Sequence, residues 1–209
     1  MNNAVLGKNI FSLKLPRVVD DVGEYMLGDS NPDLYTGDVR KVKLLADDNI
    51  PGDHPGVWNV PVESVTVNTS VPFYQSLSNF TATIISEPIV AFPASSLRSL
   101  YEIIGARPTS MLRRVPFDSR PYLPELTFNI GGHNLTINAF DYTFEVNFML
   151  DDPLACMTWF EEIEDLGLGD NTVALGSTFL KGFYTIFDFG QMEIGYRLIT
   201  TFEVEGSGH

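Results

Sequence analysis

Side chains that could carry out chemistry are unevenly represented in this sequence of 209 residues. Three His, one of them the last residue, and one Cys do not form a credible zinc set or a credible Cys–His nucleophile pair. No Gly-x-Ser-x-Gly motif and no glycine-rich phosphate loop occurs, although a Ser–His–Asp arrangement assembled by the fold stays open. Carboxylates are abundant, with 27 Asp and Glu against 13 Lys and Arg. Carboxylates are therefore the side chains most available for acid–base or cation-binding chemistry.

The densest run of carboxylates lies in residues 151–170, where Glu161, Glu162, Glu164 and Asp165 alternate with apolar side chains. A calcium loop needs carboxylates at ordered positions around a glycine turn, and this run lacks that spacing. We predict a loop or a short helix with a solvated acidic face. We expect neither a metal nor a cofactor.

The formal net charge of −14 argues against two classes of partner. Nucleic acid and anionic membrane surfaces would both be repelled by this charge. No apolar run approaches the length of a membrane span. Solubility explains the charge without further function, and a preference for basic or neutral partners is the functional interpretation.

The stretch from Ala174 to Tyr196 shows the clearest local pattern. It predicts two β-strands joined by a turn at 188–191, because β-branched and aromatic residues flank a run rich in turn formers. Just before the hairpin, Gly176 ends a short apolar run. A glycine in that position lets another backbone or a ligand approach closely.

This stretch resembles the end of the C-terminal lobe of pepsin-like aspartic proteases. The residues that match the family pattern are Leu175, Gly176, Phe179, Leu180, Phe183, Tyr184, Phe187, Asp188, Ile194, Gly195 and Tyr196. An earlier block matches the start of the same lobe at Gly23, Leu27, Gly28, Tyr35 and Gly37. Ser177 departs from the pattern, since the family usually has Asp after that glycine.

The resemblance also implies where a catalytic Asp would stand, within residues 81–93. Alignment without a gap places Ile84 there, with Ile85 on the Thr of the family motif, and an alternative with a two-residue deletion places Ser86 there. Neither recovers an acid, and no Asp-Thr-Gly or Asp-Ser-Gly occurs in the sequence. Glu87 is close by, but Pro88 removes a backbone donor that the family turn would use.

Aspartic protease chemistry needs two facing carboxylates that share a proton. The resemblance therefore implies an inactive lobe that acts as a binding, scaffold or interaction protein. The alternative is the C-terminal half of a two-lobed aspartic endopeptidase. The expected partners are a peptide or protein ligand in the old cleft, a complementary N-terminal lobe, or a second copy in a homodimer. The candidate cleft residues are Ile84, Ile85, Ser86, Glu87, Ile89, Gly176, Ser177 and Thr178.

The fold implied is all-β with one or two short helices, a single pepsin-like lobe of antiparallel strands over residues 1–205. Strands are predicted at 9–16, 23–28, 39–45, 58–60 paired with 62–67, 122–130 and 135–137, with a surface loop at 46–56 and a hairpin turn at 131–134. A helix is predicted from Ser95 or Ser96, with Ser as its cap, to Gly105. The Arg113–Arg114 pair is interpreted as a solvated loop. In the family a Cys near Phe117 bonds to one near Cys156, so Cys156 is expected to be single and buried.

Three Asn-x-Ser/Thr sequons, at Asn68, Asn79 and Asn134, are candidate glycosylation sites. With the resemblance they favour a secreted, extracellular or vacuolar protein, whose signal peptide would lie outside this sequence. Residues 206–209 are interpreted as the remnant of an expression tag.

Overall fold

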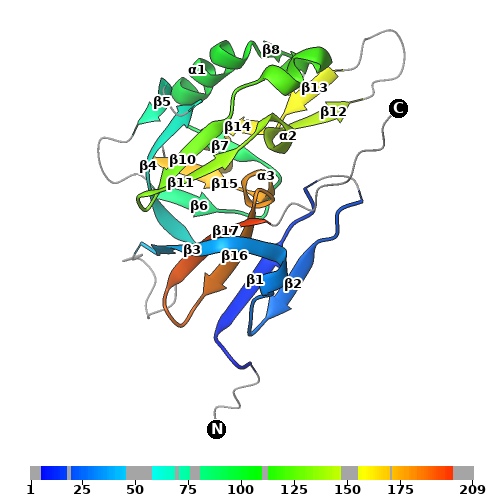
Figure 1. Ribbon diagram of the computed structural model, residues 1–209. Helices are drawn as coiled ribbons and strands as arrows, with labels where there is room; N and C mark the ends of the chain where they lie inside the picture. The colour runs from blue at the N-terminus through cyan, green and yellow to red at the C-terminus, as the bar shows by residue number, and fades with distance from the viewer. Residues whose placement is uncertain are drawn as a thin grey trace.

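The computed structural model describes residues 6–17, 20–45, 58–68, 71–75, 81–109, 113–146, 155–169 and 171–199. Three β-sheets and a few short helices make up this part of the chain, as Figure 1 shows. The predicted fold class, an all-β pepsin-like lobe with short helices, is confirmed. Most strand pairs are antiparallel, and two pairs, β6 with β15 and β7 with β14, are parallel.

A five-stranded antiparallel sheet forms the lower part of the molecule in Figure 1. Its strands, in spatial order, are β2 (Glu24–Leu27), β1 (Ile10–Lys14), β16 (Phe183–Asp188), β17 (Glu193–Ile199) and β3 (Tyr35–Lys43). The hairpin predicted at the end of the chain is thus present as β16 and β17. Alternation along these strands turns Phe187, Ile194 and Tyr196 into the core.

The upper part holds an eight-stranded mixed sheet. Its strands are β11 (His133–Ile137), β10 (Leu126–Ile130), β4 (Asn59–Val67), β6 (Thr81–Ile84), β15 (Thr172–Leu175), β7 (Val90–Phe92) and β14 (Phe160–Glu162), with β5 (Val71–Gln75) paired to β4. Both glycines of the predicted hairpin turn, Gly131 and Gly132, have positive φ, which joins β10 to β11 as predicted.

A four-stranded sheet and the helices complete the fold. The strands are β12 (Thr143–Val146), β13 (Ala155–Thr158), β9 (Arg113–Pro116) and β8 (Arg107–Pro108). The α-helices are α1 (Ala94–Ile104), α2 (Ala139–Tyr142) and α3 (Ser177–Leu180), and the 3₁₀ turns are η1 (Pro32–Leu34), η2 (Phe117–Tyr122) and η3 (Ile163–Leu166). One large apolar core joins the sheets, and Phe92, Phe128 and Phe179 are fully buried in it.

Helix α1 differs from the prediction at its start. It begins one residue before Ser95, and its N-cap is Pro93, which makes no side-chain capping bond. The Pro93 carbonyl instead accepts the first helical bond, from the amide of Leu97 at 3.0 Å. The predicted stop is correct, since Gly105 adopts the left-handed conformation that glycine tolerates.

Several predicted boundaries were wrong. The strand pair expected at 58–67 is the single strand β4, because Pro61 still offers its carbonyl to Gly131 at 3.1 Å and fits an extended backbone. The Arg113–Arg114 loop is strand β9, paired to β13. The strand at 122–130 begins only at Leu126, after η2.

The acidic region and the third strand also differ. Residues 155–162 of the acidic region form two strands, because β13 is buried along its whole length and β14 buries Phe160, and only η3 matches the predicted short helix. Strand β3 begins at Tyr35 rather than at Val39, and left-handed Gly37 lets it keep its pairing with β17. The loop predicted at 46–56 and the tag remnant at 206–209 lie outside the described residues.

Candidate functional site

The candidate cleft residues belong to two segments that the fold brings together. Strand β15 lies between β6 and β7, parallel to the first and antiparallel to the second. The turn from Ile85 to Ile89 connects β6 to β7 and therefore passes over the end of β15. Leu175 at that end pairs with Ile84, and the amide of Ile85 donates to the Leu175 carbonyl at 3.1 Å.

Gly176 is the point of closest approach between these segments. A Cβ atom on this residue would lie 2.6 Å from the carbonyl oxygen of Ile89 and closer still to that of Glu87. The amide of Gly176 donates to the Ile89 carbonyl at 2.9 Å. The sequence-based interpretation of Gly176 as a site of close backbone approach is therefore confirmed. The groups that approach Gly176 are backbone carbonyls of the turn.

Helix α3 holds the turn from the other side. The Ser177 amide donates to the Glu87 carbonyl at 3.0 Å, and the Thr178 hydroxyl donates to the Pro88 carbonyl at 2.6 Å. Three successive carbonyls of the turn are thus bound by three successive residues at the start of α3. Pro88 was not among the candidate residues, and nothing in its side chain marks it, because it takes part through its carbonyl.

The turn exposes a single carboxylate. Ser86, Glu87 and Pro88 are exposed, and the Ser86 hydroxyl lies 3.4 Å from a Glu87 carboxylate oxygen. Glu87 forms no ion pair within the described residues. Ile89 is buried in a small second core. Its buried members are Ile89, Ala91, Ile163 and Ala174, with Ile85, Trp159, Leu166 and Leu168 packed against them.

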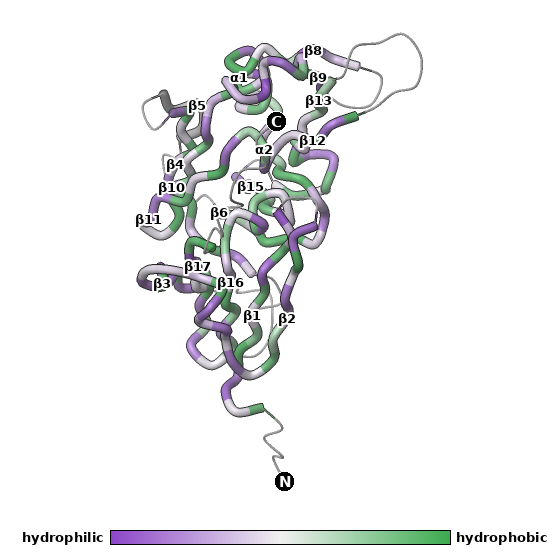
Figure 2. Tube along the Cα trace, turned by 45° about the vertical axis from the view of Figure 1, so that its right-hand side comes forward, coloured by the Kyte–Doolittle hydropathy of each residue, from purple (hydrophilic) through white to green (hydrophobic). Residues whose placement is uncertain are grey.

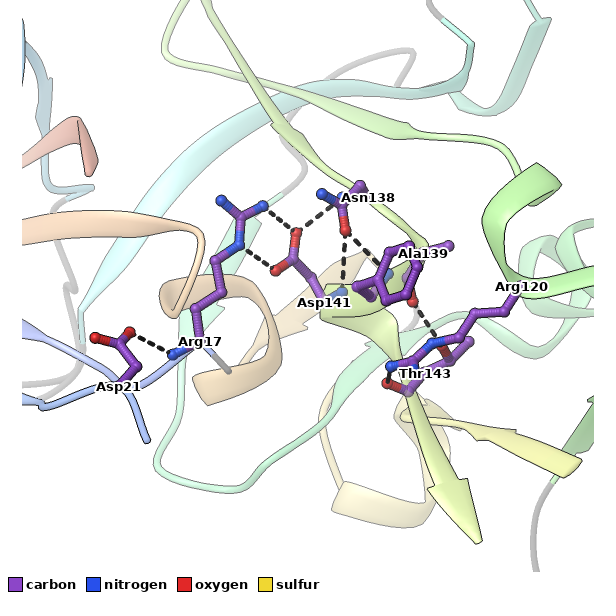
Figure 3. A network of polar contacts seen from close by, with 8 residues as sticks. Arg17, Asp21, Arg120, Asn138, Ala139, Asp141 and Thr143 are labelled. Carbon is purple, nitrogen blue, oxygen red and sulfur yellow. Dashed lines mark hydrogen bonds and ion pairs between the residues drawn. The ribbon is translucent and has the colours of Figure 1, made fainter. Parts of the chain in front are cut away.

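A buried ion pair lies beside α3, which packs against α2, and sequence reasoning missed it (Figure 3). Asp141 of α2 is completely buried and accepts two bonds from the Arg17 guanidinium, at 2.7 and 2.8 Å. The same carboxylate accepts a hydrogen bond from the backbone amide of Asn138, and the side chain of Asn138 caps α2. Arg17 follows β1, so this pair joins the five-stranded sheet to the upper part of the lobe.

Burial lowers the pKa of Lys181, which lies near this pair at the end of α3. The sequence offered one signal for the pair: an Asn-x-x-Asp capping box at Asn138 and Asp141.

The edge strand β2 of the five-stranded sheet exposes two apolar side chains beside the partly buried Phe11 and Leu13 of β1. Phe11 of β1 stacks on Phe187 with ring centroids 4.4 Å apart, and Trp58 packs edge-on against Phe187 at 4.8 Å. On β2, which pairs with β1, Tyr25 is 62% exposed and Leu27 is 56% exposed. Figure 2 shows hydrophobic stretches along both strands. We call the surface formed by Phe11, Leu13, Tyr25 and Leu27 the β1–β2 face.

The remaining sequence candidates are placed as follows. Asn68 and Asn134 are exposed, and Asn79 lies outside the described residues. Cys156 is buried and free, and burial raises the pKa of its thiol. In the described parts of the chain, no three His, Cys, Asp or Glu side chains are arranged to hold a metal ion. None of the helices described has the length and apolar character needed to cross a membrane.

Comparison with known proteins identifies the class. The family model of the eukaryotic aspartyl proteases matches residues 1–198, so the chain belongs to the eukaryotic aspartyl protease family. It is similar to renin-2 of Mus musculus, with 28% identity over 95% of this chain and 47% of the relative. It is also similar to vacuolar protease A of Aspergillus fumigatus (27% identity, 84% of this chain, 40% of the relative) and to renin of Ovis aries (27%, 93% and 47%). The chain spans about half the length of the curated relatives it matches.

Proposed function

We propose that this chain is a catalytically inactive pepsin-like lobe that acts by binding a peptide or protein. The observation that carries the proposal is the composition of the turn from Ile85 to Ile89. Its three bonded carbonyls support a rigid platform, and its exposed side chains are those of Ser86, Glu87 and Pro88. A shared proton needs a second carboxylate beside Glu87, and this lobe supplies none within the described residues.

The binding surface proposed is this platform, with Ser177 and Thr178 of α3 beside it. The carbonyls of residues 87–89 already accept hydrogen bonds within the lobe. Recognition of a ligand would therefore use the side chains and the shape of this surface. The exposed Glu87 carboxylate favours a ligand with a basic or neutral group at that point.

A complementary lobe is the partner proposed for the β1–β2 face. Soluble monomers rarely expose contiguous apolar patches unless another surface covers them. The relatives are about twice as long as this chain, which supports a second lobe rather than a second copy as the occupant. The same observation favours the alternative function, the C-terminal half of a two-lobed aspartic endopeptidase.

A cleavage assay separates the two functions. The chain is incubated at acidic and neutral pH with a library of fluorogenic peptides, and Glu87→Gln serves as the matched variant. The inactive lobe gives no turnover above a buffer blank for either protein. Turnover that Glu87→Gln abolishes would overturn the proposal. Turnover that appears only in a longer protein carrying a second lobe would establish the alternative.

Location is part of the proposal. Asn68 and Asn134, the exposed asparagines of two sequons, and the relatives whose name places them in the vacuole support a secreted, extracellular or vacuolar protein. Mass analysis of the protein purified from its natural source tests this, since glycans on either residue require passage through the secretory route.

A further inference from the structure

A cavity of about 410 Å³ opens on the outer face of the five-stranded sheet, and none of its lining residues belongs to the cleft turn or to α3. Ile194 and Tyr196 point into the core, so Gly195 between them faces the opposite side. The floor of the cavity is formed by Ile10, Ile186 and Gly195. The volume lies in the range of small-molecule sites, roughly 300–1,000 Å³.

Gly195 lets a side chain of the neighbouring strand lie directly against the floor of the cavity. A Cβ atom there would lie 2.6 Å from a methyl group of Val39, which lines the cavity. Val39 therefore rests directly on the backbone of β17. Together with Ile10 and Ile186 it gives the cavity an apolar wall and floor.

Arg197 is the cation best placed to receive a ligand. Its guanidinium lies 4.1 Å from the centroid of the Tyr35 ring, and its Nη1 donates to the carbonyl of Gly37 at 2.8 Å. These two contacts fix its plane before any ligand arrives. Within the described residues no carboxylate pairs with Arg197.

The other charges around the cavity are largely matched. Lys8 binds Asp29 at 2.6 Å, and the buried carboxylate of Glu193 binds both Lys41 and Lys43, at 2.6 and 3.0 Å. A single acid thus faces two ammonium groups at one end. Asp188 also lines the cavity, and its Oδ1 accepts from the Gln191 amide at 2.8 Å. Cations outnumber acids here, although the chain carries a net charge of −14.

We propose that this cavity binds a small amphipathic carboxylate. Its carboxylate would accept a charge-assisted hydrogen bond from the Arg197 guanidinium, whose buried Nε has no hydrogen-bond partner within the described residues. Its apolar part would cover Ile10, Ile186 and Val39. Because Tyr35 and Gly37 already hold the guanidinium, binding loses little side-chain freedom. The site is independent of the proposed cleft surface.

The test titrates 4-phenylbutyrate and its neutral amide into the isotopically labelled chain and follows the Gly195 amide and the Ile186 methyl groups by NMR. We expect saturable shifts at both positions with the acid, and affinity lower by roughly tenfold or more with the amide. Equal affinity for acid and amide would overturn the proposal. So would shifts confined to another surface, or the absence of saturable binding at millimolar concentration.

Two variants sharpen this experiment. Arg197→Gln should weaken binding of the acid by roughly tenfold or more, while Arg98→Gln, which removes an exposed arginine on α1, should leave it unchanged. Because Arg197 also contacts Tyr35 and Gly37, circular dichroism is used to check that the Arg197→Gln variant is folded. Ile186→Trp fills the floor without removing the cation and should also weaken binding. Unchanged affinity in this folded variant would contradict the proposed position of the apolar part.

Discussion

The α-carbon of Gly176 lies so close to the Glu87 carbonyl that no side chain fits between them. The chain turns at Gly176 from β15 into α3, and at the same point it passes beneath the loop that connects β6 to β7. Its φ of −94° is open to every residue type, so the requirement for glycine comes from the space available. This contact fixes the height of the candidate binding surface over the sheet.

Replacement of Gly176 by Ala should therefore destabilise the lobe. The added methyl group would have to displace backbone atoms of the turn, which costs about 1–3 kcal/mol or more. Gly169→Ala is a matched control, because nothing lies within 4 Å of the position of its Cβ and its φ is not positive. We expect a lower free energy of unfolding in denaturant titration for the first variant and little change for the second. Equal stability of the two would show that the turn is not rigid.

Local signals predicted the elements whose chemistry is visible in the chain. Three local signals were the glycine after α1, the two turn glycines before β11 and the apolar alternation along β17. The elements that they predicted are all present. The adjacency of residues 84–89 and 176–178 was suggested by family resemblance. A sequence pattern alone does not give it, because it depends on β15 lying between β6 and β7.

The predictions that were wrong concern elements that tertiary contacts determine. Arg113 reads as a loop residue, yet it lies in β9 with its guanidinium 4.8 Å from the ring centroid of Tyr101 on α1. The carboxylates of residues 151–170 indicated a loop or a short helix, although residues 155–162 form strands. Burial of Cys156 and Phe160 between neighbouring strands decides the outcome. The Arg17–Asp141 pair joins residues far apart in the chain, so it leaves no local pattern beyond the capping box.

The Arg17–Asp141 pair should be among the most sensitive polar contacts of the lobe. Arg17→Met leaves a fully buried carboxylate without its cation, and such a loss costs about 3–5 kcal/mol. The exposed pair Lys8–Asp29 is the control, and Lys8→Met should change stability little. Both are measured by denaturant titration. A double variant, Arg17→Met with Asp141→Leu, should regain part of the loss, and no recovery would argue against the buried charge as the cause.

Acid should weaken the β3–β17 contact through Glu193. Burial alone would raise the pKa of this carboxyl group, but hydrogen bonds from Lys41 and Lys43 outweigh burial and lower it below its ordinary value of 4.5. A carboxylate whose pKa is lowered by folding stabilises the protein above the unfolded pKa, and that contribution is lost as the pH falls through the folded pKa. Stability should therefore decline below about pH 4.5, and Glu193→Gln should flatten the decline. Thermal unfolding midpoints at pH 3–7 check this, and parallel curves for the two proteins would exclude Glu193 as the cause.

The β1–β2 face should govern association of the lobe. Tyr25 and Leu27 are more than half exposed, and they lie on the side of the sheet that carries Phe11 and Leu13. Covering one such side chain contributes about 1.5–3 kcal/mol, so Leu27→Ser should weaken association with a complementary lobe, or self-association, by roughly tenfold or more. Ile103→Ser removes a comparable exposed side chain from α1 and should leave association unchanged. Light scattering and sedimentation over a concentration series measure both variants. If Ile103→Ser alone reduced association, the contact surface would lie on α1 and the second lobe would have to dock there.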